Sequence, residues 1–591
     1  MASIPSYQYS ALPDSRCFIR LLALSSSTDE LSASLETFPI SEAPPYEALS
    51  YAWGDELPTS SLICNSASLA VTLHLLEGVR QIRDTIGPTK LWIDAICINQ
   101  IDVDEKAGQI PLMTQIYSQA TRVLVWLGPA ADDSDALIDE IWPLLDKLRV
   151  MTRYLYGYEF VMVGLPAEDN SFWNSLARFW SRPWFERLWV LQEVILANDV
   201  LFVCGNRTVD FALLNTLSSE AYRTGIAGHV HTIAKGTKGY MIVENLYNKR
   251  QQWKNGAPNS LHLLEYGRVL MVREPVDRVY ALHGIMEAWI RKSLAIDYSV
   301  DARREYWRLY VSISKLILGE TGLAILTSAE SCDRPPGMPS WVPNWNSLQP
   351  TWGLAGHFHA GFHIGKHSPC AGTTLSTSDS IEIAGFQLGT IVDMSILQYA
   401  SAVDEKQLRG PDGCSAQNLK VIEDALAFYL LTCKDPEEES LKGFARTLIA
   451  DTGSTQGRGK DHKYTQDVLE DFFWYRRYLS AWACGRDADG VEVTAQVVRD
   501  HVVPYAKNLH TTWLHRCIFV TDNSRIGLGS RSCQPGDVVC IFFSAECPFI
   551  LRKVPTRDSF LLISEAYVDG AMYGEALDER DPENDRYFMI D

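Results

Sequence analysis

LWIDAICINQIDVDEKAGQIPLMTQIYSQATRVLVWLG, residues 91–128, decides the fold of the N-terminal part of the chain. An apolar run stops at Asp94, a polar stretch follows, apolar residues recur at helical spacing between Ile110 and Ala120, and a second apolar run ends at Gly128. This pattern predicts a strand, a polar loop, a helix and a parallel second strand. Polar residues at the carboxyl end of the first strand lie where open α/β sheets bind ligands.

The segments on either side extend this unit. Asp102 followed by Glu105 is an acidic variant of the capping box, so we expect the helix to begin there. Upstream, Tyr46–Glu56 reads as a strand that breaks into a tight turn, and Val71–Ile86 reads as a helix that ends at Gly87. The resulting β–α–β–α–β order is typical of a doubly wound parallel sheet.

Three flanking segments complete the expected N-terminal domain. Residues 17–24 are predicted to form a strand, and a polar loop is predicted between them and Pro45. Residues 132–151 are predicted to form a helix. Arg182-Pro183-Trp184 is predicted to open a further helix, which contains Arg187, Trp189, Gln192 and Glu193.

Composition limits the class of protein. At 591 residues, roughly two to four domains are expected, and 46% hydrophobic residues indicate a globular chain. A net charge of −20 argues against a broad nucleic-acid-binding surface, although it allows a local basic pocket. We see no secretory signal and no run of 18 apolar residues, so neither a membrane span nor a membrane partner is expected. The 13 scattered cysteines read as reduced thiols, and a cytoplasmic protein is predicted.

Three ordered blocks of sequence resemble the fungal heterokaryon-incompatibility (HET) domain. They are YEALSYAWGD, LWIDAICINQ with IYSQATRVLVWLG, and RPWFERLWVLQEV, within residues 46–197. The resemblance implies a HET domain at 1–210, a helical extension at 211–345, a mixed region at 346–510 and a small β-rich module at 511–591. Two departures lie outside the blocks: His283 stands where the family usually has an apolar residue, and Val276 replaces a common Pro-Arg neighbour.

The same blocks are more distantly similar to TIR domains, which implies a TIR-like, flavodoxin-like sheet. The similarity rests on Ser50-Tyr51 followed by Gly54-Asp55, on Ile93-Asp94, and on Trp189 four residues before Glu193. Some TIR domains hydrolyse NAD with the glutamate of that helix. The resemblance therefore implies Glu193 as a catalytic residue, with NAD as substrate and no cofactor.

Elementary chemistry agrees with a single carboxylate. Nicotinamide leaves as a neutral molecule, so the main demand is to stabilise an oxocarbenium-like ribosyl cation, which a nearby carboxylate does electrostatically. Trp189 offers an aromatic face one helical turn from Glu193, and Arg182 and Arg187 could meet the pyrophosphate. The remaining substrate-binding candidates lie at strand ends: Ser50, Tyr51, Asp94 and Asn99.

Structural roles compete with each of these assignments. Trp189 could be a core residue, Glu193 a buried carboxylate paired with Arg187 or Tyr51, and Asp94 a helix cap or turn residue. No single regular element presents all four histidines of the 357–370 segment, so no metal site is predicted from His357, His359, His363 and His367 with Cys370. Cys97 has no histidine in these blocks to activate it as a nucleophile.

Three functions remain open at this stage. The first is a non-self recognition protein whose HET domain triggers growth arrest or cell death by consuming NAD, in response to a protein from an incompatible allele or locus. The second is a non-enzymatic scaffold that acts by self-association of the HET domain. The third is an intracellular regulator with no death function.

Overall fold

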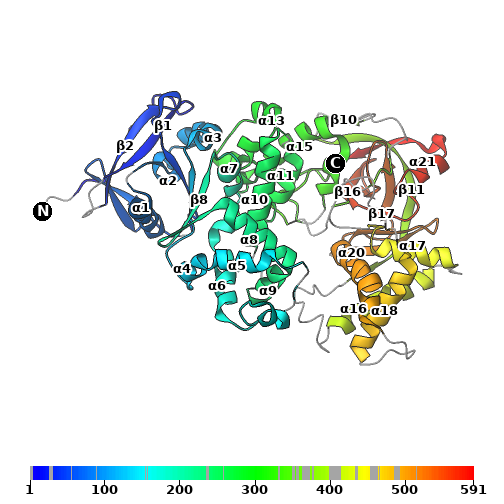
Figure 1. The fold of residues 1–591 in the computed structure, drawn as a ribbon. Coiled ribbons are helices and arrows are strands. Elements are labelled where there is room, and N and C mark those ends of the chain that lie inside the picture. The colour runs from blue at the N-terminus through cyan, green and yellow to red at the C-terminus, as the bar shows by residue number, and fades with distance from the viewer. Residues whose placement is uncertain are drawn as a thin grey trace. The chain divides into compact units, whose positions relative to one another are not determined.

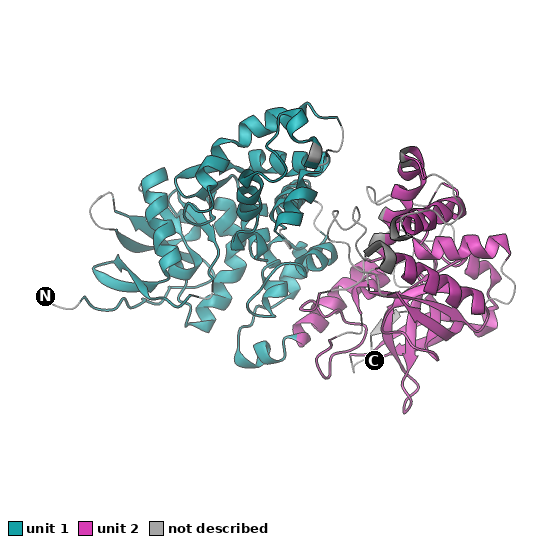
Figure 2. Ribbon diagram, turned by 90° about the horizontal axis from the view of Figure 1, so that it is seen from below, with its two compact units in different colours: residues 1–306 teal, residues 307–591 magenta. Residues whose placement is uncertain are grey.

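The computed structural model divides the chain into two compact units, Met1–Tyr306 and Trp307–Asp591 (Figure 2), and each is described by itself. The residues that the structure describes are 4–25, 31–54, 56–87, 89–152, 155, 157–234, 238–256, 259–330, 333–348, 353–354, 358–361, 373–375, 379–397, 414–432, 437–452, 464, 466–484, 493–513 and 515–591.

A nine-stranded mixed sheet forms the centre of the first unit (Figure 1). Its strand order is β5-β4-β2-β1-β6-β3-β7-β8-β9. The strands are β1 (Phe18–Leu24), β2 (Ser32–Pro39), β3 (Glu47–Tyr51), β4 (Ser60–Cys64), β5 (Ala67–Val71), β6 (Lys90–Trp92), β7 (Val123–Trp126), β8 (Val200–Cys204) and β9 (Arg207–Asp210).

The four middle strands of this sheet are parallel, as the sequence predicted, and β2 also pairs parallel with β4. β6, β3, β7 and β8 run parallel to one another, and β3 lies between the two strands of the 91–128 unit. The prediction of a doubly wound parallel sheet holds only in part, because β1, β2, β5 and β9 add antiparallel pairings and make the sheet mixed. Residues 32–39 were expected to be a loop, but they pair with β1 along its whole length while leaving most of their polar side chains half exposed.

Helices surround this sheet and continue beyond it. They are α1 (Leu73–Ile86), α2 (Asp94–Cys97), α3 (Val103–Gln119), α4 (Ser134–Asp139), α5 (Ile141–Arg149), α6 (Ser171–Trp180), α7 (Val190–Ile195), α8 (Phe211–Thr224), α9 (Ile226–Ile233), α10 (Gly239–Lys254), α11 (Ser260–Gly267), α12 (Asp277–Tyr280), α13 (Ala288–Ser293) and α14 (Val300–Arg304). The predicted cap of α3 is confirmed, because the Asp102 side chain accepts the Glu105 N–H at 2.9 Å. The single helix predicted over 132–151 is two helices, α4 and α5, which meet at Glu140.

The helix predicted to begin at Arg182 is interrupted. Residues Pro183–Glu186 form a 3-10 turn, Arg187 is extended (φ −80°, ψ 136°), and α7 begins only at Val190. The interruption has a long-range cause: Met271 donates its N–H to the Glu186 carbonyl at 2.5 Å and accepts the Leu188 N–H at 3.0 Å. This bridge holds Arg187 outside any helix, so its side chain can reach the sheet edge.

The second unit begins with an apolar helical segment. It consists of α15 (Trp307–Thr321) and a 3-10 helix (Gly322–Ser328). By length and composition alone, this is the described segment that could cross a membrane, and 56% of its apolar 18-residue window is buried inside the structure, as in the core helix of a folded domain. Further helices are α16 (Cys414–Thr432), α17 (Glu438–Leu448), α18 (Val468–Cys484), α19 (Ala495–Val497), α20 (Val503–Trp513) and α21 (Glu575–Glu579).

A β-barrel makes up the rest of this unit. Its strands are β10 (Thr373–Leu375), β11 (Ile381–Ile396), β12 (Arg516–Thr521), β13 (Ile526–Ser530), β14 (Val538–Phe542), β15 (Phe549–Lys553), β16 (Phe560–Glu565), β17 (Tyr567–Val568) and β18 (Arg586–Ile590). The long strand β11 pairs with β18, β14 and β12 in turn, and the β11–β14 pairing closes the path β14-β15-β16-β18-β11. The predicted β-rich C-terminal region is confirmed, with β11 joining it from an earlier part of the chain.

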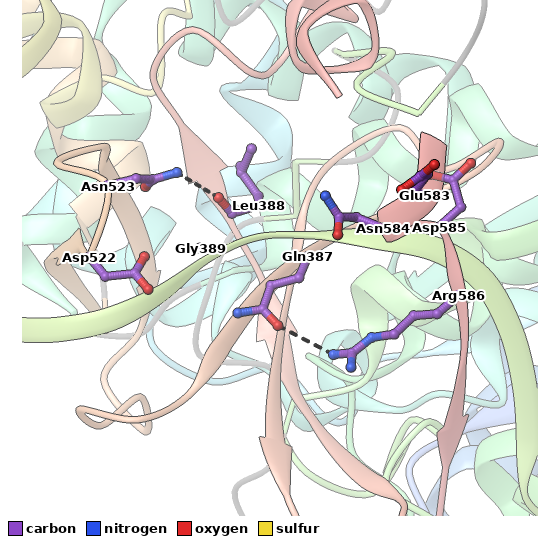
Figure 3. A pocket seen from close by; sticks show the side chains of 9 residues that line it. All are labelled: Gln387, Leu388, Gly389, Asp522, Asn523, Glu583, Asn584, Asp585 and Arg586. Atoms are coloured by element: carbon purple, nitrogen blue, oxygen red, sulfur yellow. Dashed lines mark hydrogen bonds between the residues drawn. The ribbon is translucent and has the colours of Figure 1, made fainter. Parts of the chain in front are cut away.

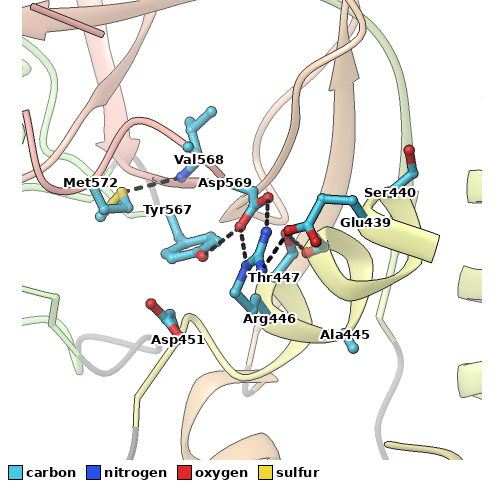
Figure 4. Close-up of polar contacts among 12 residues, drawn as sticks. Glu439, Ser440, Ala445, Arg446, Thr447, Asp451, Tyr567, Val568, Asp569 and Met572 are labelled. Atoms are coloured by element: carbon cyan, nitrogen blue, oxygen red, sulfur yellow. Dashed lines mark hydrogen bonds and ion pairs between the residues drawn. The ribbon is translucent and has the colours of Figure 1, made fainter. Parts of the chain in front are cut away.

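An ion pair fastens α17 to this barrel (Figure 4). The Arg446 guanidinium meets both carboxylate oxygens of Asp569, at 2.9 and 3.0 Å. Tyr567 also donates to Asp569 at 3.1 Å, and Glu439 contacts Arg446 from the same helix. A bidentate pair of this kind fixes both distance and orientation.

Candidate functional site

The carboxyl edge of the parallel strands gathers several of the predicted site residues. Ser50 and Tyr51 end β3, and Asp94 follows β6 directly. At the end of β7, Arg182 donates to the Leu127 carbonyl at 2.8 Å. The expectation of a polar rim at this edge therefore agrees with where the side chains lie.

Glu193 lies in α7 and is the centre of a buried network. Its carboxylate, only 2% exposed, accepts a short hydrogen bond from the Ser50 hydroxyl and lies 3.6 Å from the Arg187 guanidinium. The Trp184 indole N–H donates to the Ser50 oxygen at 2.7 Å, and Arg187 also donates to the Tyr51 carbonyl. We call Ser50, Trp184, Arg187 and Glu193 the Glu193 network.

Burial changes the acidity of this carboxylate. It raises the pKa of Glu193 to about 6, aided by the negative charge of Asp94 and opposed by Arg187 and Ser50. The pKa of Asp94 is also raised by burial, against Arg187 and two hydrogen bonds. Two buried carboxylates with raised pKa values at a strand edge are the kind of perturbation that is concentrated at functional sites.

Asp94 also performs the structural role that the sequence left open. It begins α2, accepts the Ala95 N–H at 2.7 Å and accepts the Trp53 indole N–H at 3.0 Å. Gly54, next to that tryptophan, has a φ of 64°, as the predicted tight turn requires. Asp55, the other residue of that turn, lies outside the described residues.

Trp189 and Asn99 belong to other networks. The Trp189 indole points to Asp277, at 3.4 Å, and Asp277 also accepts the Tyr298 hydroxyl at 2.6 Å. Trp189 is one helical turn from Glu193, as expected, because it has helical backbone angles and accepts the Glu193 N–H at 3.2 Å, but its indole meets Asp277 whereas the Glu193 carboxylate meets Ser50 and Arg187. The backbone N–H of Asn99 donates to Glu105 at 2.7 Å.

Two residues of the site were not predicted from the sequence. Trp184, which orients Ser50, stands within the RPWFERLW block but was used only as a helix start. Tyr117 is fully buried near Glu193 and Asp94, and its hydroxyl has no hydrogen-bond partner among the described residues. Its position in IYSQA was the available signal, but helical periodicity marked it only as a core residue.

The alternative chemistries gain no support from the described residues. No group of three His, Cys, Asp or Glu side chains in this part of the chain is arranged to hold a metal ion. Of the predicted histidine cluster only His359 is described, while His357, His363, His367 and Cys370 lie outside the described residues. Burial raises the pKa of Cys97 to about 12, which keeps its thiol protonated.

A separate cavity of about 740 Å³ lies on the barrel of the second unit (Figure 3). The Asn523 amide spans one side of it and donates to the Leu388 carbonyl at 2.8 Å, and Arg586 meets Gln387 at 3.3 Å. None of the predicted site residues lines this cavity, which carries Asp522, Glu583, Asn584 and Asp585 besides those residues and Gly389.

An α/β domain with a buried carboxylate at its strand edge, followed in the chain by helices and a β-barrel, defines the class. Residues 46–193 match the family described as Heterokaryon incompatibility protein (HET), and residues 462–590 match the Het-6 beta-barrel domain. The first match agrees with the HET domain that the sequence blocks predicted. It is similar to heterokaryon incompatibility protein 6, OR allele, of Neurospora crassa, with 28% identity over 98% of this chain and 97% of that protein. No solved structure matches the chain, so the TIR likeness stays a prediction.

Proposed function

We propose that this chain acts in non-self recognition and that its HET domain triggers growth arrest or programmed cell death. The matches to two incompatibility families and the similarity to an incompatibility protein along nearly its full length support this role. A protein from an incompatible allele or locus is the expected partner, and the cytoplasm is the expected location.

We further propose that the domain kills by hydrolysing NAD. The nicotinamide–ribose bond breaks, nicotinamide leaves with the bonding electrons, and water adds to the ribosyl carbon with loss of one proton. The products are ADP-ribose and nicotinamide. The Glu193 carboxylate would stabilise the ribosyl cation that develops in this step.

The single observation that carries this proposal is the Glu193 network. A carboxylate whose pKa is raised to about 6 lies at the carboxyl edge of four parallel strands, between a serine and an arginine. At pH 7 it is mostly ionised, as electrostatic stabilisation of a cation requires. Its side chain is almost completely buried, so its charge acts at a lower effective dielectric than in water.

The same geometry implies that the site must open. Glu193 is 2% exposed, whereas Arg187, its ion-pair partner, is 17% exposed. A substrate pyrophosphate would compete with Glu193 and the Tyr51 carbonyl for the Arg187 guanidinium. Release of Arg187 would then uncover the carboxylate, which is a reason to expect activity only when a partner or self-association drives that change.

A non-enzymatic scaffold is the second candidate, and one observation favours it. Glu193 is fully paired in this structure, with Ser50 and Arg187, as a purely structural carboxylate would be. In that case the domain would act through self-association, and its strand edge would serve stability alone.

NAD turnover separates the two candidates. Purified full chain, dilute and under crowding, is incubated with NAD, and nicotinamide release is measured for the wild type, Glu193→Gln and the control Glu186→Gln. Glu186 is an exposed carboxylate of the same segment. If the domain is an enzyme, the wild type and Glu186→Gln should release nicotinamide and Glu193→Gln should not. In fungal cells that express the protein, cell death that survives Glu193→Gln at a normal protein level would favour the scaffold.

A further inference from the structure

A short surface segment of the first unit is bonded directly to the Glu193 network. Leu270 and Val276 are each 1% exposed, whereas the residues between them are exposed or half-buried. Met271, at the start of this segment, is 63% exposed. We call residues 271–275 the strap. Because its side chains bury little surface, the strap can leave its place without unpacking the core.

The strap holds the main chain on both sides of Arg187. Met271 donates its N–H to the Glu186 carbonyl at 2.5 Å and accepts the Leu188 N–H at 3.0 Å. The two segments thus form a parallel bridge at Arg187 that belongs to no longer strand. Both hydrogen bonds use main-chain atoms of Met271, so they do not depend on its side chain.

The bridge decides what the Arg187 guanidinium can reach. Arg187 donates to the Tyr51 carbonyl at the end of β3 and lies 3.6 Å from the Glu193 carboxylate. It is therefore paired with the carboxylate that the proposed reaction needs. A guanidinium would bind a pyrophosphate through the same N–H donors, so the two uses compete.

The helix that carries Glu193 is held by other parts of the chain. The side chain of Gln192 accepts the Gly284 N–H at 2.8 Å. Arg250 donates to a carbonyl of α7 at 2.7 Å. Neither contact involves the strap. Release of the strap would therefore move Arg187 and leave the Glu193 carboxylate in place.

An ion pair of the strap adds little to this hold. Glu274 lies 3.7 Å from Arg303, and the two side chains are 32% and 36% exposed. Exposed pairs of this kind contribute little to stability, because water screens them. The two main-chain hydrogen bonds of Met271 are therefore the contacts that opening has to break.

We propose that the strap keeps the Glu193 site closed by holding Arg187 on Glu193 and Tyr51, and that its release frees Arg187 to meet the pyrophosphate of a substrate. The inference deepens the proposed NAD hydrolysis and rests on it for the identity of that substrate. The closed arrangement itself rests on the contacts of Met271 and Arg187 alone. A partner, or self-association, would activate the domain by moving the strap.

Amide hydrogen exchange of the wild-type full chain tests whether the strap opens by itself. The amides of Met271 and Leu188 are the two N–H groups of the bridge, so they should exchange together. Relative to their free-chain rates, they should exchange at least about tenfold faster than the amides of Leu124 and Val125 in β7. Exchange of all four amides at one slow rate would overturn the proposal, because the bridge would then open only with the whole unit.

A substitution at position 271 tests what the bridge does. Met271→Pro removes the N–H that Glu186 accepts, whereas Met271→Ala, the matched control, keeps it. Labelling of Arg187 by phenylglyoxal, followed by mass spectrometry, should be about tenfold faster in Met271→Pro than in wild type and unchanged in Met271→Ala. The surface residue Arg207 is the internal reference. Equal labelling of Arg187 in all three proteins would overturn the proposal.

Nicotinamide release by the dilute full chain separates failure of the strap from failure of the proposed function. Met271→Pro should release nicotinamide from NAD without crowding, and Met271→Pro combined with Glu193→Gln should not. Faster labelling of Arg187 without nicotinamide release would support the strap and count against NAD hydrolysis. Where Met271→Pro does not fold, the exchange rates of the wild type decide between a strap that opens and a fixed part of the fold.

Discussion

Replacing Glu193 by glutamine should change how the stability of the protein depends on pH. The folded-state pKa of Glu193 is about 6, against an ordinary value of 4.5, because burial penalises its charge. The folded protein therefore holds this proton more tightly than the unfolded chain does. That contribution to stability is fully present below pH 4.5 and is lost as pH rises through 6.

The magnitude follows from the shift. A difference of about 1.5 pH units corresponds to about 2 kcal/mol at 25 °C. Glutamine keeps the shape of the side chain but cannot ionise. Glu193→Gln therefore does not lose this contribution to stability as the pH rises. Relative to wild type, the variant should gain about 2 kcal/mol in free energy of unfolding between pH 4.5 and pH 7.5.

Urea denaturation of the full chain at several pH values measures how the difference in unfolding free energy between Glu193→Gln and wild type changes with pH. Comparison of the two proteins at each pH cancels all other titrating groups that they share. Glu186→Gln, at an exposed position, should show no such trend. A difference between wild type and Glu193→Gln that stays constant from pH 4.5 to 7.5 would refute the reasoning, because it would mean that Glu193 titrates normally.

Three further substitutions have defined outcomes. Arg187→Met leaves the Glu193 charge buried without its partner and should lower the free energy of unfolding, measured by urea denaturation, by about 3 kcal/mol. The double substitution Arg187→Met with Glu193→Gln should restore most of this loss. If the double variant is as unstable as Arg187→Met, the pairing is contradicted. Arg20→Met should lower the free energy of unfolding by about 3–5 kcal/mol, because Arg20 pairs with the buried Glu105 at 2.6 Å. Amide hydrogen exchange should also become faster at the N-terminus of α3, and unchanged exchange would count against this prediction. Burial raises the pKa of Glu565 to about 7. The free energy of unfolding of Glu565→Gln should therefore rise by about 3 kcal/mol relative to wild type between pH 4.5 and 8. A difference between the two proteins that does not change with pH would exclude this pKa shift.

Local chemistry made part of this structure predictable. The strand, helix and strand of residues 91–128 follow from apolar periodicity, and Asp102 caps α3 because its carboxylate suits the free N–H groups there. Ser50 and Asp94 could be placed at one edge because parallel strands end together.

The errors arose where distant residues decide local structure. The break at Arg187 depends on Met271, and the orientation of Trp189 depends on Asp277, 88 residues away. No periodicity near residue 187 indicates either contact. Residues 32–39 were taken for a loop because their Ser, Thr and Glu side chains dominate the segment and only Leu35 of this strand is buried.

The role of Glu193 in NAD hydrolysis is the central claim, and one measurement addresses it most directly. Nicotinamide release from NAD is followed with wild-type full chain, Glu193→Gln and Glu186→Gln, at equal folded concentration and under crowding. We predict turnover by the wild type and by Glu186→Gln, and none by Glu193→Gln. Equal nicotinamide release by all three proteins would contradict the claim. The claim would also be contradicted if none of the three proteins consumed NAD in cells that the wild type kills.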